Sequence, residues 1–368
     1  MTSAEQDEAG DEPVDEPVDE PDATGDAGHF YTPAYTFLRM WRPNHRPYGR
    51  TMQHGNRRPS PEPDSAGQAR CDSTVTSTVF GAVTAHAARG AGRADRAALI
   101  DTTDGRALTY AELAAVVPTA AAGLARRGVL TGDVAAVHVP CARQLTLAVH
   151  ALTAAGAVPA PIPRAGIASA DDLAELLTAY DARMLVTAPP LGRIALDAAD
   201  RSYVRQVFAF GDVPGATPFG ELLRGGGPPP RIDPRRDHAL IQPGLRLTHA
   251  DRLAELDRLA AAVAVDAGDV LIGAAAGCPP ATWVGLIDVA LLRGATFVAV
   301  GRPGTAPLLR AIETYDATLA IVAPVTLRTL AQEAAVPPRP VRLLVAGPAP
   351  RDAVRACRDH DWSVGTLL

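Results

Sequence analysis

The strongest constraint on the fold is a regular alternation that begins near Thr74 and continues to the end of the chain. Short apolar runs, rich in Val, Leu and Ala, alternate with longer segments whose apolar residues recur at helical spacing. Alternation of this kind predicts a parallel-rich sheet with helices on its faces, because parallel neighbours need a crossover connection. The predicted fold class is therefore α/β.

Individual elements follow from the same pattern. Thr109 and Glu112 form a capping-box sequence, which predicts a helix that starts there and ends before Gly128. Pro118 lies inside this helix and is expected to kink it. The further predicted helices are 141–155, 171–180, 249–265, 283–292, 306–315 and 324–335, and the predicted strands are 97–100, 134–139, 157–162, 183–187, 270–274, 296–300, 318–322 and 341–345.

Residues 1–70 differ from this body in charge and pattern. Residues 1–28 carry eleven Asp and Glu and no Arg, whereas residues 29–70 carry seven Arg against Glu62 and Asp64. Acidic, proline-containing repeats cannot bury enough apolar surface to form a core, so we expect residues 1–70 to be a disordered tail. Its Arg and aromatic residues could stack on single-stranded nucleic acid. We instead favour a linker, or a motif that binds an unidentified protein partner. Residues 29–70 have only seven Arg, and the acidic segment 1–28 precedes them, which disfavours binding to nucleic acid.

Composition excludes several classes of chemistry. All 35 basic residues are arginine, which excludes a Schiff base, a lysine general base or a P-loop lysine from this sequence. Cys71, Cys141, Cys278 and Cys357 are widely spaced, so neither a zinc site nor a disulfide framework is expected, and no metal ligands are assigned. No apolar run is long enough for a membrane helix and no signal-peptide layout is present, which predicts a cytoplasmic protein with no membrane partner.

A series of short motifs carries a family resemblance. They are Leu108-Thr-Tyr-Ala-Glu-Leu113, Ala121-Ala-Gly-Leu-Ala125, Thr131-Gly-Asp-Val134, Val149-His-Ala-Leu-Thr-Ala-Ala-Gly-Ala-Val-Pro159, Ala182-Arg-Met-Leu-Val-Thr187, Leu247-Thr-His249, Leu291-Leu-Arg-Gly-Ala295 and Ala346-Gly-Pro-Ala-Pro350. In this order they resemble the AMP-binding, acyl-adenylate-forming superfamily, and most nearly its 4-coumarate–CoA-ligase-like acyl-CoA synthetases. The resemblance assigns residues 71–368 to the large N-terminal domain of that fold.

The resemblance implies a two-step ligase that uses ATP, Mg²⁺ and CoA. A carboxylate attacks the α-phosphate of ATP to form an acyl-adenylate, and CoA then displaces AMP. By the same resemblance, Thr248 and His249 mark the start of the helix after the phosphate loop, and Gly347 and Pro348 match the turn near adenine. Trp283 and Gly285 correspond to the segment that shapes the acyl pocket. All six residues also have ordinary structural explanations as caps, turns or core.

Three departures from the family pattern argue against catalysis. The family has a Ser/Thr/Gly-rich phosphate loop that ends in Pro-Lys-Gly before the Leu-Thr-His stretch, and roughly nine residues of it are absent between Gln242 and Leu247. The segment Gly277–Gly285 lacks the usual aromatic/His pattern. The sequence also ends before the family's Tyr-Gly-x-Thr-Glu motif and its C-terminal domain.

These departures lead us to predict a degenerate, catalytically inactive protein with no catalytic residue and no bound cofactor, kept for binding or assembly. Three alternatives stay open at this point: a coding remnant without function, half of a split acyl-CoA ligase completed by a partner chain, and a Rossmann-type dinucleotide domain. The last is disfavoured because no G-x-G-x-x-G follows a predicted strand.

Overall fold

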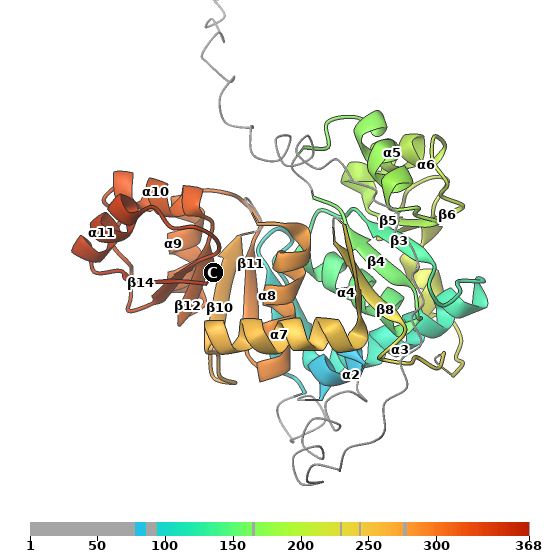
Figure 1. Ribbon diagram of the computed structural model, residues 1–368, viewed down its shortest axis with the longest axis horizontal. Coiled ribbons are helices and arrows are strands. Elements are labelled where there is room, and N and C mark those ends of the chain that lie inside the picture. The colour runs from blue at the N-terminus through green and yellow to red at the C-terminus, as the bar shows by residue number, and fades with distance from the viewer. Residues whose placement is uncertain are drawn as a thin grey trace, which may run out of the picture. The chain divides into compact units, whose positions relative to one another are not determined.

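Two parallel-rich sheets and one short hairpin make up the strands of the described residues (Figure 1). The computed structural model describes residues 78–85, 94–163, 166–228, 230–242, 244–274 and 278–367. All of them belong to one unit, Gln53–Leu368. The predicted tail, residues 1–70, lies outside the described residues, and so does Cys71.

The larger sheet has seven strands. Their order is β14 (Ser363–Thr366), β13 (Arg342–Val345), β12 (Leu319–Val322), β10 (Val270–Ala274), β11 (Thr296–Val300), β1 (Ala97–Asp101) and β2 (Arg106–Thr109). Every neighbouring pair is parallel except β1 with β2. Strand β1 pairs with β11 in the register Leu99↔Phe297, so two segments far apart in the sequence close this sheet.

The second sheet has five parallel strands, in the order β4 (Val158–Pro161), β3 (Val134–Val137), β5 (Met184–Thr187), β6 (Gln206–Ala209) and β7 (Thr217–Pro218). All four residues of β3, β4 and β5 are buried, as expected for parallel strands covered on both faces. The hairpin β8 (His238–Gln242) and β9 (Leu245–Thr248) follows this sheet in the chain.

Helices cover both sheets. They are α2 (Val79–Thr84), α3 (Tyr110–Arg126), α4 (Ala142–Ala154), α5 (Ala170–Ala179), α6 (Gly192–Ala199), α7 (His249–Val263), α8 (Pro280–Arg293), α9 (Thr305–Thr314), α10 (Pro324–Gln332) and α11 (Arg351–Asp359), with short 3₁₀ turns η3 (Pro189–Leu191) and η4 (Phe219–Leu223). Of the described helices, none is both long enough and apolar enough to cross a membrane.

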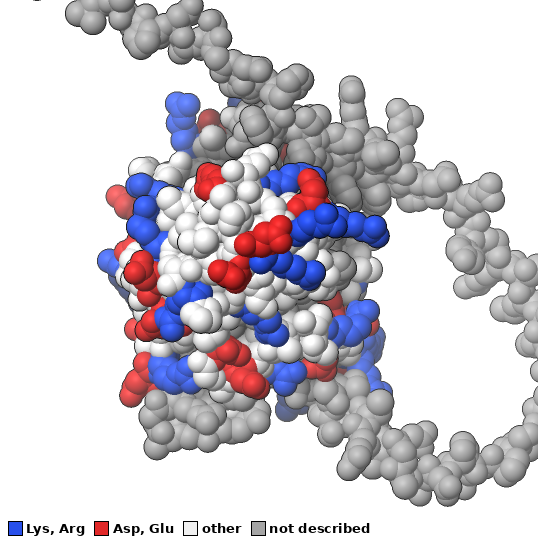
Figure 2. Space-filling model, turned by 90° about the vertical axis from the view of Figure 1, so that its left-hand side faces the viewer, with Lys and Arg blue, Asp and Glu red and all other residues white. Residues whose placement is uncertain are grey.

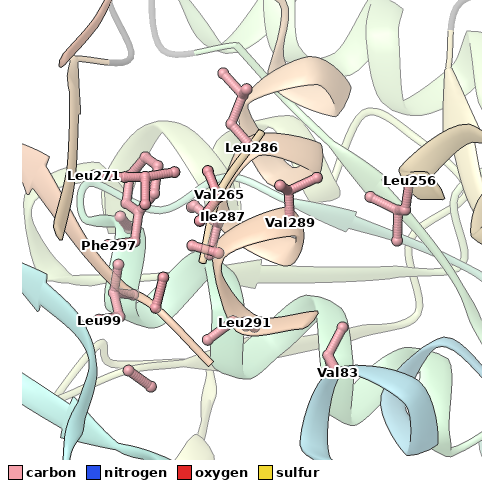
Figure 3. Packing of buried hydrophobic residues seen from close by; sticks show 14 of the residues in the cluster. Val83, Leu99, Leu256, Val265, Leu271, Leu286, Ile287, Val289, Leu291 and Phe297 are labelled. Carbon is pink, nitrogen blue, oxygen red and sulfur yellow. The ribbon is translucent and has the colours of Figure 1, made fainter. Parts of the chain in front are cut away.

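Helix α8 lies at the centre of the fold. Ten of its residues are buried, on every side of the helix, which is typical of a helix enclosed by the core. Leu286, Val289 and Leu291 of α8 pack with Phe297 of β11 and Leu99 of β1, as Figure 3 shows. Val284 of the same helix belongs to the cluster around the five-stranded sheet. Helix α8 therefore joins the cores of the two sheets.

The α/β prediction is confirmed, and each predicted helix and strand appears at its predicted place. Nine further helices and strands of the described residues were not predicted: α2, β2, α6, β6, β7, β8, β9, α11 and β14. Helix α11 was missed because it has nine residues and only Ala353 and Cys357 are buried, too few to show a helical stripe in the sequence.

Candidate functional site

The hairpin β8–β9 occupies the place in the chain where the phosphate loop was expected. Its strands pair up to Gln242 and Leu245, so only residues 243 and 244 connect them. Gly244 has φ +75°, a left-handed conformation that glycine adopts without steric cost. A phosphate cradle needs a run of free backbone N–H groups, and a two-residue turn provides too few of them.

Thr248 ends the hairpin and caps α7. Its side chain accepts a hydrogen bond from the Asp251 backbone N–H (3.1 Å), and the Asp251 carboxylate accepts one from the Thr248 backbone N–H (3.2 Å). This reciprocal capping box satisfies two N–H groups at the start of the helix. The Thr248 side chain thus has a complete structural role.

His249, the first residue of α7, is fully buried. Its Nδ1 accepts a hydrogen bond from the backbone N–H of Val79, at the start of α2 (3.2 Å). Burial lowers the pKa of His249 to about 4, against a smaller opposing effect of Asp237. The imidazole is therefore neutral near pH 7 and tied to α2.

Trp283 and Gly285 lie on the first turns of α8. Trp283 is buried and meets Phe297 edge to face, with ring centroids 5.2 Å apart. A Cβ on Gly285 would lie 3.3 Å from a guanidinium nitrogen of Arg252. Trp283 therefore fills the core, and Gly285 makes room for a buried arginine.

Gly347 and Pro348 follow β13 in the seven-stranded sheet. Gly347 has φ +125°, and Pro348 is exposed to solvent. The structure thus places Thr248 and His249 at the start of α7, and Trp283 and Gly285 on the neighbouring helix α8, while Gly347 and Pro348 follow β13.

Sequence reasoning missed a cluster of buried charge next to these helices. Arg252 of α7 donates to Asp288 of α8 (3.2 Å), and Asp288 also contacts His150 of α4 (3.1 Å between Nε2 and Oδ1). A signal was available in the sequence. His150 and Asp288 are single polar residues inside otherwise apolar helical runs, Leu147–Leu152 and Val284–Leu292. Such residues are buried only with a partner.

The described residues give no support for a nucleophilic cysteine at Cys278 or for a metal-binding site. Burial raises the pKa of the Cys278 thiol to about 12, so the nucleophilic thiolate is scarce at neutral pH. In the described ranges no group of three His, Cys, Asp or Glu side chains could hold a metal ion.

Charge on one face of the molecule is mixed. Figure 2 shows basic and acidic side chains interspersed on the side that carries α10 and α11. One pair in this part of the fold joins Arg339 and Asp316. The described residues on this face therefore form no continuous basic patch, which binding to nucleic acid would require.

Comparison with known proteins gives a family match over most of the chain. A family model described as "AMP-binding enzyme" matches residues 86–362. The salicyl-AMP ligase / salicyl-S-ArCP synthetase of Mycobacterium tuberculosis is 30% identical over 295 residues, which are 71% of this chain and 51% of that protein. The chain thus spans about half the length of this curated relative.

Two solved structures show the same fold. A long-chain-fatty-acid-CoA ligase from Archaeoglobus fulgidus aligns with a TM-score of 0.68 at 20% identity, over 78% of this chain and 63% of the ligase. The N-terminal domain of FACL13 from Mycobacterium tuberculosis aligns with a TM-score of 0.66 at 16% identity, over 79% of this chain and 75% of that domain. At these identities the likeness concerns the fold alone.

Proposed function

Because the chain belongs to the AMP-binding enzyme family, we propose that it is a member without adenylate-forming activity, whose α/β body serves binding or assembly. The family resemblance further suggests an origin among 4-coumarate–CoA-ligase-like enzymes. The structural roles of three predicted site residues fit this proposal. Thr248 caps α7, His249 accepts a buried hydrogen bond, and Trp283 packs in the core.

One observation carries the proposal: the register of the β8–β9 hairpin. Gln242 pairs with Leu245, so the connection is two residues long where the resemblance implies a loop that binds triphosphate. Pro243 has no backbone N–H to donate. Arg246, on the exposed part of β9, offers a charge, but one solvated arginine cannot replace a set of convergent N–H groups.

Pyrophosphate exchange tests the proposal. The protein is incubated with Mg²⁺-ATP, labelled pyrophosphate and aromatic acids such as salicylate and 4-coumarate, with the salicyl-AMP ligase of Mycobacterium tuberculosis as positive control. We expect exchange at the level of the blank, and no saturable heat when Mg²⁺-ATP is titrated calorimetrically into folded protein. Exchange above the blank with any acid would show that the chain forms adenylates.

A second candidate is half of a split ligase that acts with a partner chain. It is favoured by one observation, namely that the chain spans about half of the relative with which it aligns. In that case residues 1–70 are a candidate partner-binding segment, and a stoichiometric partner should co-purify and restore exchange. The short hairpin argues against it, because the phosphate loop would belong to the half present here.

A further inference from the structure

Five polar side chains form a continuous hydrogen-bonded chain across four elements. Gln242 of β8 donates to one oxygen of Glu255 (3.3 Å), and Arg252 donates to the other (2.7 Å). Arg252 also contacts Asp288 of α8 (3.2 Å), which in turn contacts His150 Nε2 of α4 (3.1 Å). We call these five residues the latch. It connects the end of the hairpin strand β8 with a helix of the five-stranded sheet.

Of the four charged or ionisable side chains of the latch, only that of Glu255 is more than slightly exposed. The side chain of Glu255 is 35% exposed, that of Arg252 3%, that of Asp288 2% and that of His150 1%. Within the described part of the chain, His150 Nδ1 has no hydrogen-bond partner, so the polar chain ends there. Glu255 is consequently the only charged latch residue that solvent or a second molecule can readily reach.

The surrounding structure is adapted to the latch. Gly285 leaves the space beside α8 that the Arg252 guanidinium occupies. Ala239 of β8 belongs to the core cluster that contains α8, and Ile241 belongs to a cluster of the five-stranded sheet. The hairpin therefore contacts the cores of both sheets, and the latch runs along the same junction.

Stability alone does not explain a buried group of this kind. Desolvation offsets most of the attraction in a buried ion pair, and well-packed apolar residues often stabilise such a site equally well or better. Buried charges do fix relative orientation, because only one arrangement satisfies all of them.

We propose that the latch is a conformational device that holds the β8–β9 hairpin against α7 and couples its mobility to α4. Glu255 is its release point, because this residue alone joins Gln242 to the buried charges. Losing the Glu255 carboxylate frees the hairpin while the Arg252–Asp288 pair stays intact. This proposal does not depend on whether the chain binds a nucleotide.

Hydrogen–deuterium exchange of the full chain measures hairpin opening directly. In the Glu255→Ala variant we expect amides in 238–242 and 245–248 to exchange about tenfold faster, with β10 and β11 unchanged. His150→Leu, at the opposite end of the latch, should accelerate the same hairpin amides. Asp104→Ala is the matched control, because it removes a partly exposed ion pair with Arg143 on the helix that carries His150, and it should leave the hairpin unchanged.

Faster hydrogen exchange confined to the hairpin amides distinguishes coupling between the latch and the hairpin from general destabilisation of the fold. The proposal is wrong if the hairpin amides of His150→Leu exchange at the wild-type rate. It is also wrong if the amides of all strands exchange faster by the same factor. Should the loss of the His150–Asp288 contact prevent folding of that variant, the triple variant Arg252→Met/Asp288→Leu/His150→Leu removes every buried latch charge. We expect it to fold with a hairpin that exchanges faster relative to β10 and β11, and wild-type protection of its hairpin would refute the latch.

Discussion

At the residue scale, buried histidines show how context changes a side chain's chemistry. His249 and His150 are both almost inaccessible, yet their partners differ: a backbone N–H that donates to the first and a carboxylate that accepts from the second. A neutral ring with a lone pair on Nδ1 is required to accept from Val79. His249 is therefore an anchor for α2 whose function depends on staying unprotonated.

The lowered pKa of His249 predicts a pH dependence of stability. Between about 4, the pKa in the folded state, and 6.5, its ordinary value, the unfolded chain binds more protons at this residue than the folded chain. His249 should therefore destabilise the fold as pH falls from 6.5 towards 4, by on the order of 3 kcal/mol in total. Above pH 6.5 its contribution is constant.

Urea unfolding of wild type and His249→Gln at a series of pH values measures this effect. Glutamine retains an acceptor oxygen but does not titrate in this range. We expect the free energy of unfolding to fall less steeply between pH 6.5 and 4 in the variant than in wild type. Parallel curves would show that His249 is not the group responsible, since the carboxylates titrate in both proteins.

At the element scale, the β8–β9 hairpin is the most informative unit. Its two-residue connection depends on Gly244, whose φ of +75° costs other residues about 1–2 kcal/mol. Gly244 therefore sets the local geometry of this turn.

Substitution at Gly244 tests that geometry. Gly244→Val should lower the free energy of unfolding by about 1–2 kcal/mol, because a β-branched residue is disfavoured at positive φ. Gly244→Asn is the matched variant and should cost less, because Asn tolerates the left-handed region. Thermal or urea unfolding measures both, and equal losses would argue against a left-handed residue at this turn.

At the scale of the whole molecule, the two sheets share their cores. Helix α8 contributes Leu286 to the cluster around the seven-stranded sheet and Val284 to a cluster of the five-stranded sheet. Partly buried Leu145 and Ala154 of α4 pack against both clusters. Because each half loses buried surface when the other unfolds, we expect the described part of the chain to unfold as one unit.

Two core substitutions, one in each half, test this cooperativity. The substitutions are Leu286→Ala and Leu185→Ala. Leu286 of α8 belongs to the cluster around the seven-stranded sheet, and Leu185 lies in β5 of the five-stranded sheet; both side chains are buried. Each should cost about 2–5 kcal/mol, the usual range for leucine-to-alanine changes in a core. Calorimetry should show a single transition that shifts down in both variants. Two separate transitions, of which each variant moves only one, would show that the halves unfold independently.

The sequence by itself determined the fold class, the family and most elements. Alternating apolar runs and helical stripes are local signals, so β1, α7, α8 and the capping box at Thr109 could be read from neighbouring residues. The family motifs were likewise local. The shortness of the segment between Gln242 and Leu247 was visible too, because only four residues separate them.

Only the tertiary structure decided which strands pair and which polar residues meet. Strand β1 joins β11 across nearly two hundred residues, and no local pattern specifies a partner at that distance. The meeting of His150, Asp288 and Arg252 depends on how three helices cross, and so does the role of Gly285 as space for a guanidinium. Helix periodicity tells which face of a helix is buried, but the packing of one face against another is a property of the whole fold.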